Sequence, residues 1–151
     1  MTLLHGTCVS FPLIETDGLC AAVLLRGPPG IGKSDLALRL IDDGAMLVAD
    51  DQVKVSERDD MLIAAPPETT AGLLEVRGVG LVQLPCVAEA RLVGVIDLVA
   101  AGEIERMPGD ETTDVAGRAV PLWRLQAFEA SAMAKIGVIV ALAAGRAELA
   151  T

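Results

Sequence analysis

The fold of this chain is decided by an eight-residue stretch that reads Gly27-Pro28-Pro29-Gly30-Ile31-Gly32-Lys33-Ser34. It fits G-x-x-x-x-G-K-[ST], the pattern of a phosphate-binding loop. The apolar run 21–25 predicts a buried strand before the loop, and residues 33–42 carry apolar side chains at helical spacing after it. In this strand–loop–helix context, backbone N–H groups can surround a phosphate. We therefore expect Lys33 to contact the β- and γ-phosphates of a nucleotide and Ser34 to ligate Mg²⁺.

The composition is that of one folded domain. The chain has 151 residues, of which 52% are hydrophobic, and we expect a single domain over residues 1–151. No apolar run approaches the roughly 18 residues of a membrane span, and the N-terminus has no signal-like segment. The expectation is a cytoplasmic protein with no membrane partner. Its three widely spaced cysteines, Cys8, Cys20 and Cys86, are expected to be reduced, buried thiols.

The charge of the chain argues against nucleic acid as its main partner. The formal net charge is −9, whereas binding to a phosphate backbone needs stripes of Lys and Arg. With only two Phe and one Trp, the chain also has little material for base stacking. A negative net charge favours a basic protein partner through electrostatic steering, although charge alone identifies no such partner.

Short apolar runs separated by turn residues predict more strands than helices. Residues 12–18 are expected to form a turn or a short hairpin connection, and the polar segment 102–117 is expected to form an exposed functional loop. Too little sequence lies between most strands for crossover helices, so we expect an α/β or α+β fold with a mixed sheet. The expected strands are 2–11, 19–26, 45–49, 53–57, 61–65, 73–76, 79–84, 92–98 and 120–125, and the expected helices are 33–42 and 127–144.

Two adjacent carboxylates, Asp50 and Asp51, follow an apolar strand sixteen and seventeen residues beyond Ser34. Phosphoryl transfer needs a carboxylate that holds Mg²⁺ and a group that positions or deprotonates the acceptor. Neighbouring strand residues point to opposite faces, so both carboxylates reach one site only if the strand ends or bulges there. We predict such a break, and one carboxylate could then act as a base. The alternative is a solvated acidic turn.

The roles of Glu75, Arg77 and His5 cannot be decided from their positions in the sequence. Glu75 and Arg77 stand two apart, on one face of a predicted strand. They form either a surface ion pair of little value or a metal contact and a phosphate contact. His5 is the only histidine, and such a residue is more often packed or exposed without function than a proton relay.

Four pieces of the sequence, taken in order, resemble HPr kinase/phosphorylase, the bacterial regulator that phosphorylates a serine of the phosphocarrier protein HPr. The resemblance covers roughly residues 2–107, and its third and fourth pieces are the most specific. The pieces are Leu4-His5-Gly6, the loop Gly27–Ser34, Leu47-Val48-Ala49-Asp50-Asp51-Gln52-Val53 and Leu74-Glu75-Val76-Arg77-Gly78-Val79-Gly80.

The resemblance implies a fold, a reaction and a set of catalytic residues. The fold would be the phosphate-loop, mixed-sheet fold that this family shares with bacterial-type phosphoenolpyruvate carboxykinases. The reaction would use ATP and Mg²⁺ to phosphorylate HPr, in a protein that assembles as a homo-hexamer. Asp50 would be the base that takes the serine proton, and Asp51 would assist with metal or substrate. Lys33 would clamp the phosphates, and His5 would lie near the reacting phosphate.

The resemblance also implies the residues that bind metal and nucleotide. Ser34, Asp51 and Glu75 would form the metal side of the site. Arg77 and Arg106 would approach the phosphates beside the loop.

Among its departures from the family, the chain has residues 121–128 in place of a P-G-R-N-like stretch. Whether a phosphorylase activity is kept, and how HPr docks, therefore stay open. The chain looks like the short alpha-proteobacterial form, in which HPr belongs to a regulatory phosphorelay. Two alternatives are a phosphate-loop kinase with a small-molecule acceptor and a nucleotide-binding regulatory module without transfer activity.

Overall fold

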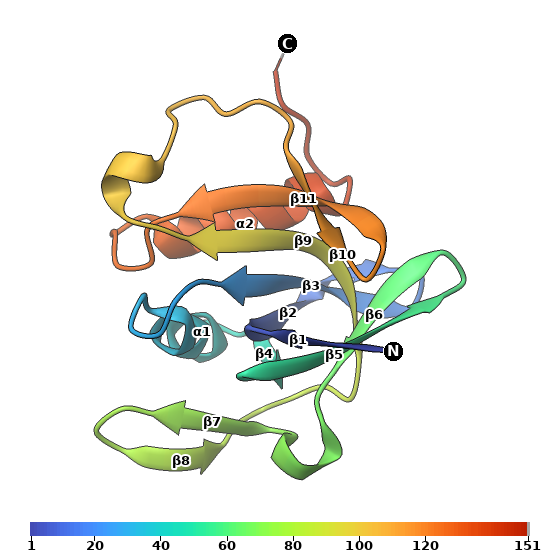
Figure 1. Ribbon diagram of the computed structural model, residues 1–151, viewed down its shortest axis with the longest axis vertical. Coiled ribbons are helices and arrows are strands. Elements are labelled where there is room, and N and C mark those ends of the chain that lie inside the picture. The colour runs from blue at the N-terminus through green and yellow to red at the C-terminus, as the bar shows by residue number, and fades with distance from the viewer. Residues whose placement is uncertain (151) are drawn as a thin grey trace.

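Three parallel strands form the centre of a mixed sheet in the computed structural model, which describes residues 1–150 (Figure 1). β3 (Leu19–Arg26) pairs with β9 (Ala90–Leu98), and β9 pairs with β11 (Arg118–Leu125). β3 and β9 are nearly continuous apolar runs because the middle of the sheet is covered on both faces, whereas burial alternates along β11. The carboxyl ends of the three strands lie at one edge of the sheet, where the three arrowheads in Figure 1 point the same way.

Antiparallel strands extend the sheet on both sides of this centre. The order is β1-β5-β6-β9-β3-β2-β4, and β10 pairs with β11 off this path. A two-stranded hairpin, β7–β8, stands apart from the main sheet. The bounds are β1 (Thr2–His5), β2 (Thr7–Thr16), β4 (Met46–Ala49), β5 (Gln52–Arg58), β6 (Met61–Ala65), β7 (Leu73–Val76), β8 (Gly80–Gln83) and β10 (Thr112–Val115).

Two helices cover one face of the sheet. α1 (Lys33–Asp42) and α2 (Ala132–Ala143) bury their apolar sides in one core cluster with β3 and β9. Leu74 of the β7–β8 hairpin belongs to the same cluster as Leu36 of α1, so the hairpin packs beside this helix. A second core cluster, made of strand residues, fills the opposite face. Two short 3₁₀ turns complete the structure, η1 (Glu68–Thr70) and η2 (Ala101–Glu103).

β1 and β2 form one extended segment with a bend at Gly6, and β4 and β5 form a second segment, antiparallel to the first, with a bend at Asp50-Asp51. β1 pairs with β5 and β2 pairs with β4 in a shared register, with His5 opposite Gln52 and Cys8 opposite Ala49. At the bend, the Gly6 N–H donates to the Asp51 carbonyl at 3.0 Å. A side chain at Gly6 is excluded, because a Cβ there would lie 2.8 Å from both Leu24 Cδ1 and Leu25 O. The bend places the His5–Gly6 piece beside the Asp50–Asp51 piece.

The mixed sheet is confirmed, and so are the strand over 19–26 and the helix over 33–42. The expected strand 2–11 is divided at Gly6. The expected turn or hairpin connection over 12–18 is shorter than predicted, because β2 continues to Thr16 and only residues 17–18 form the turn to β3. Pro12 is tolerated there since the β2–β3 register shifts between Phe11 and Glu15.

Two expectations in the second half of the chain are only partly correct. The segment 102–117 is not a single loop, because β10 occupies residues 112–115. The last helix begins at Ala132 rather than at residue 127. No helix within residues 1–150 combines the length and the apolar character that crossing a bilayer requires.

The expectation of buried thiols is correct for Cys8, which is fully buried, and wrong for Cys86, which is exposed. Burial raises the pKa of Cys8 to about 12. We therefore expect an aromatic disulfide reagent at pH 8 to modify Cys86 in the folded protein and Cys8 only after unfolding. Mass spectrometry of the labelled peptides measures this, and labelling of Cys8 at the rate of Cys86 would contradict it. The thiol of Cys8 has a pKa of about 8.5 in the unfolded chain. As the pH rises from that value to about 12, the unfolded state loses its proton and the folded state keeps it, so the free energy of unfolding decreases.

Candidate active site

The phosphate-binding loop connects the end of β3 to the start of α1, at the edge where the parallel strands end. Ligands of open α/β sheets bind at the carboxyl ends of the strands, and this loop lies there. Gly32, which precedes α1, has a left-handed backbone with φ 110°, and the Leu36 N–H donates to its carbonyl at 2.9 Å. A Cβ at Gly32 would lie 2.8 Å from Ala127 Cβ and 2.9 Å from Phe128 Cζ. Only glycine fits this position.

The segment between β11 and α2 packs against the loop. Ala127 and Phe128 contact Gly32, and the Arg39 guanidinium of α1 donates to the Ala127 carbonyl. These contacts explain why the last helix begins later than its composition predicts. Ala127 and Phe128 pack against the loop instead of continuing the helix.

Lys33 lies across the loop from the first turn of α1. Its Nζ donates to the Gly27 carbonyl at 2.5 Å and to the Pro28 carbonyl at 3.1 Å. Both acceptors belong to the loop itself. The ammonium group is thereby placed over the loop where a bound polyphosphate needs a cation.

Asp50 lies at the end of β4, beside the loop. Its Oδ1 accepts hydrogen bonds from Ser34 Oγ at 3.2 Å and from Thr7 Oγ1 at 2.9 Å. The predicted strand end is present, since β4 ends at Ala49 and Asp51 has a left-handed backbone with φ 68°. Aspartate tolerates this conformation better than most residues. The structure therefore brings Asp50 to the residue of the loop that is expected to bind metal.

Asp51 points to a different neighbour. Its Oδ1 lies 3.3 Å from His5 Nδ1, and both side chains are exposed, at 76% for Asp51 and 63% for His5. The bend in the β1–β2 strand creates this contact, because His5 pairs with Gln52 just beyond Asp51. The two carboxylates thus lie side by side, with Asp50 toward the loop and Asp51 toward His5 and solvent.

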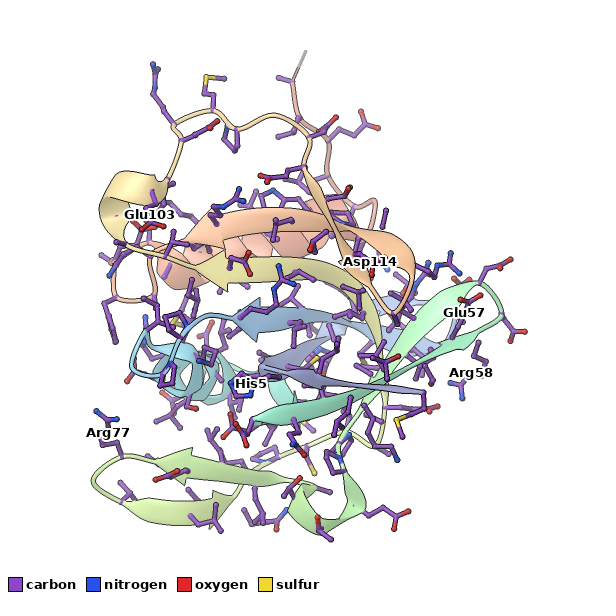
Figure 2. All side chains as sticks on the ribbon, in the orientation of Figure 1. His5, Glu57, Arg58, Arg77, Glu103 and Asp114 are labelled. Carbon is purple, nitrogen blue, oxygen red and sulfur yellow. The ribbon has the colours of Figure 1, made fainter. Side chains whose placement is uncertain are left out.

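The other predicted site residues are not in contact with this group. Glu75 lies on β7, and Figure 2 shows Arg77 projecting from the turn between β7 and β8. Arg106 lies in the exposed segment between η2 and β10. Within residues 1–150, no hydrogen bond or ion pair joins Glu75, Arg77 or Arg106 to the loop or to Asp50.

A charged pair that sequence reasoning missed supports the start of the loop. The Arg26 guanidinium, on the last residue of β3, donates to both Asp97 oxygens at 2.7 and 3.1 Å. Arg124 stands opposite Asp97 on β11 and hydrogen-bonds Glu111, which lowers the pKa of that carboxyl. These residues lie far apart in the chain, and only the strand register could have revealed them.

The donor set fits Mg²⁺. A hard cation of this kind binds oxygen, commonly through one or two carboxylates together with phosphate oxygens and water. Ser34 presents a hydroxyl, and Asp51 presents an exposed carboxylate next to Asp50, which hydrogen-bonds Ser34. Within the residues that the structure describes, no three His, Cys, Asp or Glu side chains gather at one point.

The fold and the site define a phosphate-loop protein with a mixed sheet and a carboxylate beside the loop serine. A sequence profile described as "HPr Serine kinase C-terminal domain" matches residues 2–144. The chain belongs to this family.

Relatives from two Clostridium species and one solved structure agree with this assignment. The chain is 39% identical over 119 residues to the HPr kinase/phosphorylase of Clostridium tetani, covering 77% of the chain and 36% of the relative. It is 45% identical over 83 residues to that of Clostridium perfringens, covering 55% of the chain and 25% of the relative. The chain therefore spans only a quarter to about a third of the length of these relatives.

The structural neighbour is described as the Hpr(Ser) kinase/phosphatase from Coxiella burnetii. It superposes with a TM-score of 0.76 at 22% sequence identity, over 93% of this chain and 88% of that one. At this identity the likeness establishes the fold. It confirms the expected HPr kinase type of mixed sheet.

Proposed function

We propose that this chain is an ATP- and Mg²⁺-dependent protein serine kinase that phosphorylates HPr. The observation that carries the proposal is the contact between Ser34 of the phosphate-binding loop and Asp50 at the end of β4. A bare phosphate-binding loop binds a nucleotide, whereas a carboxylate beside it supplies what transfer also requires. Membership of the HPr Serine kinase C-terminal domain family supports HPr as the acceptor.

The residues of the loop would hold the triphosphate. Backbone N–H groups of Gly27, Gly30 and Gly32 would face it, while the Ile31 N–H donates to the Pro28 carbonyl at 3.2 Å. Pro28 and Pro29 have no N–H to donate and shape the loop. Lys33 would exchange its two loop carbonyls for phosphate oxygens. Ser34 would hold Mg²⁺, which neutralises charge on the transferred phosphoryl group.

Asp50 would accept the proton of the acceptor serine. Its Oδ1 already accepts two hydrogen bonds, and its Oδ2 has no partner within residues 1–150. The serine oxygen would attack the γ-phosphorus as its proton moves to Asp50, with ADP as the leaving group. Asp51 would assist on the metal or substrate side, and His5 would lie near the reacting phosphate.

Three residues outside this contact group are kept as proposals from the resemblance. Glu75 would complete the metal side, and Arg77 and Arg106 would approach the phosphates. Glu75 and Arg77 belong to the β7–β8 hairpin, and Arg106 belongs to the segment between η2 and β10. From the same resemblance we propose one catalytic domain over residues 1–151, a homo-hexamer, and action in the cytoplasm.

The test is a comparison of acceptors. The purified chain is incubated with labelled ATP and Mg²⁺ in the presence of HPr, of HPr with its acceptor serine replaced by alanine, or of a panel of small hydroxyl compounds. We expect label on HPr only when the serine is present. Rapid turnover of a small acceptor with none on HPr would instead favour a small-molecule kinase. Binding of ATP without transfer to any acceptor would favour a regulatory module.

A further inference from the structure

The hydroxyl of Thr7 is the second donor to Asp50, and it comes from outside the phosphate-binding loop. Thr7 is the first residue of β2 and is only 1% exposed. Its Oγ1 donates to Asp50 Oδ1 at 2.9 Å, closer than Ser34 Oγ at 3.2 Å. We propose that Thr7 is a positioning residue for phosphoryl transfer, which holds the Asp50 carboxylate by one oxygen. The inference rests on the proposed function.

The bend in the strand pair brings the two side chains together. Thr7 and Asp50 lie next to Gly6 and Asp51, whose backbone hydrogen bond joins the strands at the bend. Beyond them Cys8 is paired with Ala49. Threonine is branched at Cβ, so its hydroxyl has few orientations available. The hydroxyl therefore meets the carboxylate from a rigid strand rather than from a loop.

The two donors to Asp50 Oδ1, Thr7 and Ser34, have different roles in the proposed reaction. The Ser34 hydroxyl is also expected to ligate Mg²⁺, so it does not hold Asp50 alone. Thr7 is buried and has no second partner within residues 1–150. Thr7 is thus the donor that can hold Oδ1 throughout turnover and leave Oδ2 free to accept a proton.

Ser10, also on β2, is a buried hydroxyl residue with a purely structural hydrogen bond, and it serves as a comparison for Thr7. Ser10 is fully buried, and its Oγ donates to the Met46 backbone carbonyl at 3.3 Å. That hydrogen bond ties β2 to β4 and involves no residue of the site. Thr7 and Ser10 both lie on β2 and are each no more than 1% exposed, so Ser10 is a matched control for Thr7.

The test compares Thr7→Val, Thr7→Ser and Ser10→Ala with the wild type in the HPr phosphorylation assay. Valine keeps the shape of threonine and removes the donor, so kcat should fall about 10- to 100-fold. KM for ATP should change less than about threefold, because Asp50 does not bind the nucleotide in this account. Thr7→Ser should restore most of kcat, and Ser10→Ala should leave it near the wild-type value.

A readout that needs no turnover accompanies the kinetics. A crystal structure of Thr7→Val should show the Asp50 side chain turned away from its wild-type position or in two orientations, whereas Thr7→Ser should keep one. If Thr7→Val does not fold, Thr7→Ala removes the same hydroxyl, and melting temperatures identify variants that are only destabilised.

Each remaining outcome decides against the proposal. An unchanged kcat in a folded Thr7→Val variant overturns it, and so does a rise in KM alone. Failure of Thr7→Ser to restore kcat would reduce Thr7 to a packing residue. If the wild type transfers no phosphate to HPr, the proposed function itself is overturned. If the wild type is active and Thr7→Val is equally active, only the role of Thr7 is overturned.

Discussion

Asp50→Asn is expected to reduce phosphoryl transfer to HPr by about 10²- to 10⁴-fold, the usual contribution of a general base. Asparagine has the same shape as aspartate, and its amide oxygen can still accept the hydrogen bonds of Thr7 and Ser34. It cannot take a proton. Nucleotide affinity, measured by calorimetry with a non-hydrolysable ATP analogue, should therefore change little while kcat is lost.

The control for this variant is Asp59→Asn, in the exposed turn between β5 and β6. Its left-handed backbone, φ 51°, suits asparagine as well as aspartate, so its activity should equal that of the wild type. Asp51→Asn is measured beside them. If Asp50→Asn keeps phosphoryl transfer and Asp51→Asn loses it, the general base is Asp51, the carboxylate beside His5.

Lys33→Ala is expected to lower kcat by about 10²- to 10³-fold and also to weaken ATP binding. The reason is that one preorganised cation at the developing phosphoryl charge contributes this much in comparable sites. The ammonium group is already placed over the loop by the Gly27 and Pro28 carbonyls, so little rearrangement is needed when phosphate binds. Steady-state kinetics and calorimetry measure the two effects separately.

Lys135→Ala is the matched control for the loss of a lysine. Lys135 lies on α2 and forms an exposed ion pair with Glu129 at 2.5 Å, which contributes little to stability. Its removal should leave both kcat and affinity unchanged. An active Lys33→Ala variant with normal affinity would show that the loop does not bind the polyphosphate in the proposed way.

The parts of the fold that the sequence predicts well are those that depend on neighbours in the chain. β3, the phosphate-binding loop and α1 follow from one apolar run, a glycine pattern and helical spacing. The break after Ala49 was also predictable, because two adjacent carboxylates can share a site only where a strand ends. Each of these inferences uses fewer than about twenty residues, in line with the short reach of sequence patterns.

The parts that the sequence does not predict depend on pairing over long distances. Nothing local places Thr7 opposite Asp50 or Arg26 opposite Asp97, since both contacts follow from strand register. The late start of α2 has the same origin, because helix-forming residues after Leu125 are used to cover Gly32. The positions of Glu75 and Arg77 relative to the loop also depend on how the β7–β8 hairpin packs, and they remain proposals.

Intact-mass spectrometry of HPr tests the central claim most directly. HPr is incubated with this chain, ATP and Mg²⁺, and its mass is compared with that of a sample lacking ATP. The account predicts the gain of one phosphoryl group, located on a serine by fragmentation and absent with the Asp50→Asn variant. An unchanged HPr mass, from a chain that binds ATP normally, would contradict it.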